Sequence, residues 1–203
     1  EIMFELAEKF PNIKYLDMGS GFKVPFQEGD METDVKSLGK KVEKALAAFS
    51  KESGKEFQLW FEPGKFLVSK SGHLLVKANV IKQTTATVFV GVNSGFNHLI
   101  RPMFYDSYHN IENISNIDGT ERIYTVVGNI CETDTFAWDR KITEVREGDV
   151  LVFRNAGAYG FEMSSNFNSR LKPAEVMFLD GQAHLIRKRD VFEDLLKNQI
   201  EVL

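Results

Sequence analysis

Two glycine-bearing turns follow short apolar segments and have the composition of anion-binding loops. Gly19-Ser20-Gly21 follows the segment 13–18, and Glu62-Pro63-Gly64 follows the segment 57–61. Glycine lets backbone N–H groups approach a ligand closely, and a short helix predicted over 66–70 would add the positive end of its dipole. Such loops predict a phosphate ligand, although a plain tight turn would have the same composition. Because no Gly-Lys-Ser/Thr sequence is present, a nucleotide P-loop is not indicated.

Polar and aromatic side chains also gather near the middle of the chain. Arg101 is followed closely by Tyr105, Tyr108 and His109, after the polar loop 93–98. This grouping is compatible with a binding site, and equally with a surface arginine packed among aromatic rings. The sequence alone leaves both interpretations open.

Two further segments combine reactive or polar side chains. Cys131-Glu132-Thr133-Asp134 places a thiol beside two carboxylates at the end of a predicted strand, although a lone cysteine is more often a small buried apolar residue. The segments 157–160 and 163–166 form a long polar loop, which is either functional or simply solvated. The four histidines show no metal-ligand spacing, so no metal site is predicted.

The first part of the chain, residues 1–72, alternates helix and strand. Apolar spacing predicts a helix over 2–10, a strand over 13–18, a helix from about 33 to 53 and a strand over 57–61. A strand, a helix and a second strand in that order form a βαβ unit with two parallel strands. Their carboxyl ends share one edge of the sheet, where α/β proteins bind ligands, so both glycine turns and Glu62 are expected at that edge.

The second part, residues 73–203, is predicted to be an antiparallel β domain. Strand-like segments are predicted at 74–80, 86–92, 123–130, 150–154 and 174–179. Asp180-Gly181 lies between two such runs and predicts a two-residue hairpin. Only 191–198, near the end, has helical spacing in this part. The fold class is therefore α/β followed by β.

The composition is that of an ordinary globular domain. The chain has 203 residues, 43% hydrophobic and 27% charged, with a formal net charge of −4. This charge argues against general nucleic-acid binding, and no apolar run approaches the length of a membrane span. A single cysteine excludes an internal disulfide. We expect a cytoplasmic protein that uses neither nucleic acid nor membrane as a partner.

Taken in order, these motifs resemble the diaminopimelate decarboxylase family of pyridoxal-phosphate enzymes. The resemblance runs over essentially the whole chain and is carried by segments 19–22, 62–65, 100–102, 131–134 and 157–160, with 163–166 and 170–175 in addition. It implies the closing βα units of a (β/α)₈ barrel followed by an antiparallel β-barrel or sandwich domain. The chain begins within a helical pattern at Glu1, so we expect a C-terminal fragment of such an enzyme.

The resemblance also implies a role for each matching residue. The positions of Gly19, Gly21 and Gly64 hold the phosphate of pyridoxal 5'-phosphate, and Glu62 faces the pyridine nitrogen. Tyr159 contacts cofactor and substrate.

Other matching positions concern the substrate and the proton. Arg101 and Tyr105 match substrate-binding residues, and Glu132 matches a residue that binds the substrate's distal amino group. Cys131 matches a proton donor that reaches the cofactor of the neighbouring subunit, which implies a homodimer with shared active sites. The implied reaction is decarboxylation of meso-2,6-diaminopimelate, a small amino acid, to L-lysine.

The chain departs from the family pattern at a few positions. Ser20 interrupts a run of glycines, and Lys65 stands in the substrate site where the family usually has Arg, which is not equivalent at a bidentate site. The lysine that carries the cofactor lies on earlier barrel strands in the family and has no match here, so the fragment alone is expected to be inactive. Two alternatives stay open: a decarboxylase of another basic amino acid, such as ornithine, lysine or arginine, and a non-catalytic β module for dimerisation or binding.

Overall fold

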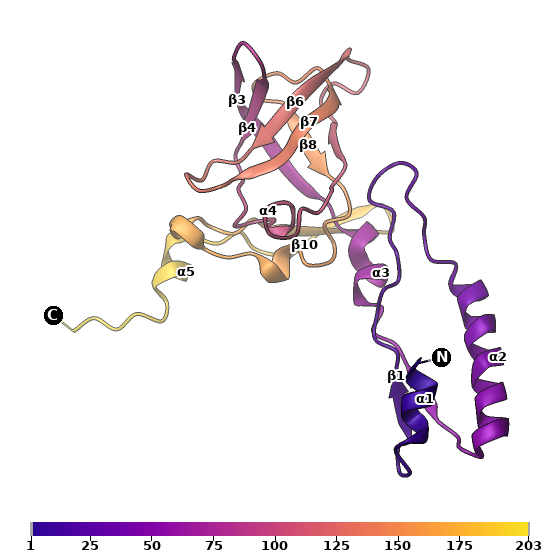
Figure 1. Ribbon diagram of the computed structural model, residues 1–203. Coiled ribbons are helices and arrows are strands. Elements are labelled where there is room, and N and C mark those ends of the chain that lie inside the picture. The colour runs from indigo at the N-terminus through magenta and orange to yellow at the C-terminus, as the bar shows by residue number, and fades with distance from the viewer. Residues whose placement is uncertain (1, 203) are drawn as a thin grey trace. The chain divides into compact units, whose positions relative to one another are not determined.

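The computed structural model describes residues 2–202 and divides the chain into two compact units, 1–69 and 70–203. Each unit is considered by itself. Most helices and strands of both units are labelled in Figure 1.

The first unit contains two short parallel strands with helices around them. Its elements are α1 (Ile2–Glu8), β1 (Tyr15–Asp17), α2 (Val35–Ser53), β2 (Gln58–Trp60) and α3 (Gly64–Val68). β1 and β2 pair in parallel, with Leu16 opposite Leu59. The βαβ unit predicted from the sequence is therefore present, although both strands are shorter than their apolar runs.

Local signals explain the bounds of α2. The carboxylate of Asp34 accepts a hydrogen bond from the Ser37 backbone N–H at 3.0 Å, which caps the first turn. Gly54 ends the helix in the left-handed conformation, with φ of 68°. The inner side of α2 contributes Phe49 to a small core, where its ring stacks on those of Phe4 and Phe57. This core holds the strands whose ends carry the glycine turns.

The second unit is built on a six-stranded sheet in the order β5-β8-β3-β4-β6-β7. Its strands are β3 (Leu74–Gln83), β4 (Val88–Val92), β5 (Ile111–Asn113), β6 (Glu121–Val127), β7 (Thr135–Thr143) and β8 (Val150–Phe153). The outer strands β5 and β7 contact each other, so the sheet is nearly closed into a barrel. Its interior is filled by apolar side chains, among them Val90, Val126, Leu151 and Phe153.

The sheet is not purely antiparallel, which corrects the sequence-based prediction. β4 and β6 pair in parallel, with Val90 opposite Val126. The connection between them is long enough to return to the starting end, because it includes β5 and the short helix α4 (Arg101–Tyr105). β5, β7 and α4 were not predicted, since each is short or rich in polar residues.

The predicted hairpin near the end of the chain is confirmed. β9 (Glu175–Leu179) pairs with β10 (Gln182–Arg187) in antiparallel fashion. Asp180 and Gly181 both have positive φ, 50° and 75°, as a type I′ turn requires. The last predicted helix is present as α5 (Phe192–Leu196).

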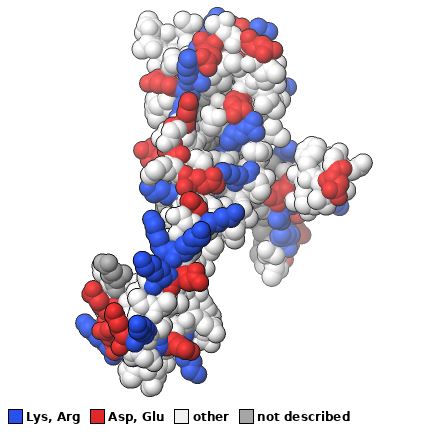
Figure 2. All heavy atoms as spheres, turned by 90° about the vertical axis from the view of Figure 1, so that its right-hand side faces the viewer, with Lys and Arg blue, Asp and Glu red and all other residues white. Residues whose placement is uncertain are grey.

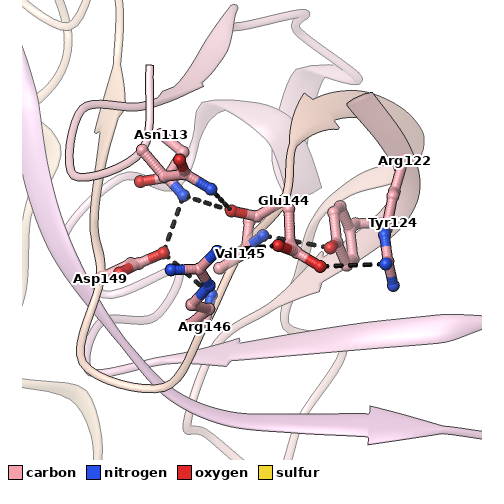
Figure 3. A network of polar contacts seen from close by, with 8 residues as sticks. Asn113, Arg122, Tyr124, Glu144, Val145, Arg146 and Asp149 are labelled. Carbon is pink, nitrogen blue, oxygen red and sulfur yellow. Dashed lines mark hydrogen bonds and ion pairs between the residues drawn. The ribbon is translucent and has the colours of Figure 1, made fainter. Parts of the chain in front are cut away.

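A polar network joins the segment 144–149 to β5 and β6 (Figure 3). The Asn113 side chain donates to the Glu144 carbonyl at 2.9 Å and to the Asp149 carboxylate at 2.8 Å. The same carboxylate accepts from the Arg146 backbone N–H at 2.9 Å. The Tyr124 hydroxyl accepts from the Val145 backbone N–H at 3.1 Å. The network fixes the turn before β8 to the strands beside it.

Charged side chains of both signs are interspersed over much of the face shown in Figure 2. Within residues 2–202, no helix has the length and apolar character needed to span a membrane.

Candidate functional site

The two glycine turns of the first unit lie side by side at the carboxyl ends of β1 and β2. The Glu62 backbone N–H donates to the Gly19 carbonyl at 2.8 Å, which extends the strand pairing into the turns. The Asp17 carboxylate accepts from the Gly19 N–H at 2.8 Å. The ring of Phe22 packs against that of Phe61 at 5.8 Å between centroids. The expectation that both turns share one sheet edge is confirmed by these contacts.

The backbone conformation of this turn pair requires glycine at two of the three glycine positions and does not require it at the third. Gly19 and Gly21 have φ of +66° and +119°, values that side-chain-bearing residues rarely adopt. Gly64 has no positive φ, and a Cβ added there would meet no atom within 4 Å. Ser20 does not have a positive φ, so the serine fits without backbone strain. Space beside all three glycines is open within the described part of the first unit, which fits a phosphate-bearing group.

Lys65 and Glu62 lie close to this turn pair. Glu62 is exposed at the end of β2, where its carboxylate can face a ligand. Lys65 lines a hollow of about 430 Å³ together with Lys23, Asp30 and Met31. A hollow of this size can hold a small amino acid, and it presents two ammonium groups.

In the second unit, three of the predicted site residues come together at α4. The Arg101 guanidinium lies 5.8 Å from the Tyr105 ring centroid and 5.7 Å from that of Tyr159. Its Nη2 donates to the Ser107 hydroxyl at 3.1 Å. Arg101 is only 9% exposed, and this burial lowers its pKa from the usual arginine value, while the two tyrosines and Glu162 oppose the shift. Arg101, Tyr105 and Tyr159 therefore form one cluster with a positive charge between two rings.

The loop that carries Tyr159 is fixed by close backbone packing. Its Ala156 N–H donates to the Gly72 carbonyl at 2.8 Å. A Cβ on Gly72 would lie 2.4 Å from the Cα of Gly157, so only glycine fits there. Tyr159 itself has φ of +56°, and its N–H donates to the Glu162 carboxylate. This strained conformation at an exposed tyrosine marks the loop as a candidate functional segment.

The histidine of this region has a structural partner. His109 is 2% exposed, and its Nδ1–H donates to the Arg154 carbonyl at 2.8 Å. Burial lowers the pKa of His109, and the nearby charges of Arg101 and Arg140 lower it further, so the ring is neutral at pH 7. Among the described residues, no group of three His, Cys, Asp or Glu side chains could hold a metal ion.

Cys131 and Glu132 lie on a different loop of the second unit, between β6 and β7. Both are exposed, and the Asn168 side chain donates to the Cys131 Sγ at 3.7 Å. The loop is held by Asp134, which is 5% exposed and accepts two backbone hydrogen bonds. Sequence reasoning gave Asp134 no role. A Cβ added at Gly95 or Gly128 would lie too close to the Asp134 carboxylate, and these two glycines were the only feature of the sequence that pointed to it.

Family comparisons agree with the two units. Residues 1–69 match the profile of the pyridoxal-dependent decarboxylase pyridoxal binding domain, and residues 65–157 match that of the pyridoxal-dependent decarboxylase C-terminal sheet domain. The chain is 38% identical over 193 residues to a diaminopimelate decarboxylase of Methanothermobacter thermautotrophicus, covering 92% of this chain and 44% of that protein. It is 37% identical over 205 residues to that of Escherichia coli K12, covering 95% and 49%. The chain thus spans about half the length of these relatives.

Solved structures show the same likeness. A crystal structure of diaminopimelate decarboxylase superposes with a TM-score of 0.88 at 35% identity, covering 97% of this chain and 50% of that one. The M. jannaschii diaminopimelate decarboxylase in complex with L-lysine gives 0.87 at 31% identity, covering 99% and 46%. A lysine decarboxylase from Selenomonas ruminantium shares the fold at 20% identity, with a TM-score of 0.70 and coverage of 88% and 46%.

Proposed function

This chain belongs to the pyridoxal-dependent decarboxylases, and from that premise we propose that it forms part of a diaminopimelate decarboxylase. The reaction would remove CO₂ from meso-2,6-diaminopimelate at its D-configured carbon and give L-lysine. Residues 1–72 would be closing βα units of the (β/α)₈ barrel, and residues 73–203 the β domain. The observation that carries the proposal is the cluster of Arg101, Tyr105 and Tyr159, with a buried guanidinium between two rings.

The turn pair of the first unit would hold pyridoxal 5'-phosphate. Gly19, Gly21 and Gly64 would let the backbone of the two turns approach its phosphate closely, and the open space beside them supports this assignment. The N–H groups of Gly19 and Gly64 donate to the Asp17 carboxylate and the Glu62 carbonyl, so either would have to change partner to bind the phosphate. Glu62 would keep a proton on the pyridine nitrogen. When bound there, the cofactor would supply the electron sink that stabilises the carbon losing CO₂.

In each unit, taken by itself, we assign residues to substrate binding. Arg101 would bind a carboxylate through its paired N–H donors, with Tyr105 and Tyr159 shielding it from water. Lys65 would add a positive charge from the hollow that it lines. Burial strengthens the charge–carboxylate attraction of Arg101, because little water competes for the guanidinium.

The Cys131 loop would complete the site of a second copy in a homodimer. Cys131 would return a proton to the carbon that has lost CO₂. Glu132 would bind the distal ammonium of the substrate. The exposure of both side chains supports a role toward a neighbouring molecule.

The test is to restore the missing half. The 203-residue chain is co-expressed with the part of the Methanothermobacter enzyme that it does not match, and CO₂ release from meso-diaminopimelate is measured with added pyridoxal phosphate. Arg101→Met should raise KM strongly. The matched control, Arg122→Met, removes an exposed arginine that pairs with Glu144 and should leave KM unchanged. Comparable kcat/KM for ornithine or L-lysine would favour the other basic amino acid decarboxylases, and no turnover of any of them would contradict the proposal.

A further inference from the structure

Asp134 joins two loops that are far apart in the sequence. Its carboxylate accepts from the Phe96 backbone N–H at 2.6 Å through Oδ1 and from the Ile130 backbone N–H at 2.9 Å through Oδ2. Its own carbonyl accepts from the Gly128 N–H at 2.7 Å. Because the side chain is 5% exposed, these hydrogen bonds are shielded from water.

The space around this carboxylate is reserved by two glycines. A Cβ on Gly128 would lie 1.9 Å from Oδ2 of Asp134, and a Cβ on Gly95 would lie 2.8 Å from the same atom. Neither glycine has a positive φ, so backbone conformation does not require glycine at either position. Gly128 is therefore accounted for by the position of the Asp134 side chain, and Gly95 by the side chains of Asp134 and Ile130 together.

A third loop is attached to the same assembly and touches the cysteine. The Ser165 N–H donates to the Asn97 carbonyl at 2.8 Å, and the Arg170 guanidinium donates to the Asn129 carbonyl at 3.3 Å. From this loop the Asn168 side chain reaches Cys131 Sγ. Any release of the 128–134 segment would therefore change the surroundings of the thiol.

Charge is consistent with a buried acceptor at this position. Burial raises the pKa of the Asp134 carboxyl, and the N–H groups of Ile130 and Phe96 and the charge of Arg170 oppose that rise. The charged form of the Asp134 carboxyl is thus stabilised by these N–H donors, and the positions of the two loops are held by their hydrogen bonds to the carboxylate.

We propose that Asp134 is the positioning residue of the Cys131–Glu132 segment, fixing it through the backbone N–H groups of Phe96 and Ile130. The inference deepens the proposed function, since it rests on the roles given there to Cys131 and Glu132. Asp134 acts through the backbone and not on the substrate: it determines the positions of the Cys131 thiol and the Glu132 carboxylate.

The experiment uses the 203-residue chain and needs no cofactor. Because the Cys131 thiol is already exposed in the folded chain, opening of the loop is followed at the Phe96 and Ile130 amides, by hydrogen exchange. Asp134→Asn keeps the shape of the side chain but places an NH₂ group against a backbone donor. Losing one such hydrogen bond should raise the population of the open loop, and with it the exchange rate of these two amides, by about fivefold.

Asp149→Asn is the matched control, because Asp149 also accepts from one backbone and one side-chain N–H in the same unit (Figure 3). It should lower the melting temperature without changing the exchange rate of the Phe96 and Ile130 amides. If Asp134→Asn does not fold, Gly95→Ala, which displaces the carboxylate without removing it, should raise the rate in the same direction. A folded Asp134→Asn or Gly95→Ala chain with the wild-type rate would overturn the proposal. Failure of the restored enzyme to turn over would leave this result unaffected and count against the proposed function alone.

Discussion

Replacing Gly64 by alanine separates the stability of the chain from its proposed binding of a cofactor. Gly64 is the first residue of α3, has no positive φ and has open space where a Cβ would lie. Alanine at such a position stabilises the folded chain by about 0.4–1 kcal/mol, because it restricts the unfolded state. If the backbone at Gly64 contacts the phosphate, however, the added methyl group meets the ligand and costs about 1–3 kcal/mol of binding, or roughly 5- to 140-fold in affinity.

The measurement compares two glycines of the same turn pair. Urea unfolding of the 203-residue chain should show Gly64→Ala more stable than wild type. Gly21→Ala should be less stable by about 1–3 kcal/mol, because its φ of +119° strains any side-chain-bearing residue. Pyridoxal phosphate affinity is then measured by absorbance on the chain assembled with the complementary part of the Methanothermobacter relative. A stabilised Gly64→Ala variant with unchanged affinity would refute the phosphate assignment, and a destabilised one would refute the geometry.

Three further predictions concern catalysis, specificity and pH. In the restored enzyme, Cys131→Ala should lower kcat by about 10²-fold at unchanged cofactor affinity; an unchanged kcat would exclude this thiol as the proton donor. L-lysine lacks the far carboxylate that Arg101 would bind, so its kcat/KM should fall below that of meso-diaminopimelate by about 10⁴-fold, a ratio that steady-state assays measure directly. The hydrogen bond from Arg154 lowers the pKa of Glu112, so this carboxylate stabilises the fold above its unfolded pKa and ceases to do so as the pH falls through the lowered value. The pair is partly exposed, so Glu112→Gln should cost less than about 1 kcal/mol at pH 7. This difference should shrink as the pH falls through the lowered pKa, and melting curves whose separation does not shrink on acidification would contradict the assignment.

The parts of the fold that the sequence predicted are those with local causes. The βαβ unit follows from apolar spacing and from chain connectivity, and the β9–β10 hairpin follows from the two residues of its turn, Asp180 and Gly181. The parallel pairing of β4 with β6 has no such cause. It joins segments separated by α4 and β5, and only the nearly closed sheet decides it.

The candidate site divides in the same way. Gly19 and Gly21 could be singled out from the sequence because a turn after a strand is a local pattern, and their positive φ values agree with it. The cluster of Arg101 and Tyr159 depends on a contact between residues far apart in the chain, so a resemblance to a family could suggest it but spacing could not.

Asp134 shows most clearly why sequence reasoning stops where it does. As a carboxylate beside Cys131 it reads as one more exposed acid, and its Phe96 partner lies 38 positions away. Its burial gives it a different role: the Asp134 carboxylate, just before β7, is the hydrogen-bond acceptor for backbone N–H groups of two loops. Gly95 and Gly128 reflect this arrangement in the sequence, because a side chain at either position would lie too close to the Asp134 carboxylate. Gly128 shows that a glycine with ordinary φ can mark a close approach by another group, whereas Gly64 has ordinary φ and open space, so the structure is needed to tell the two cases apart.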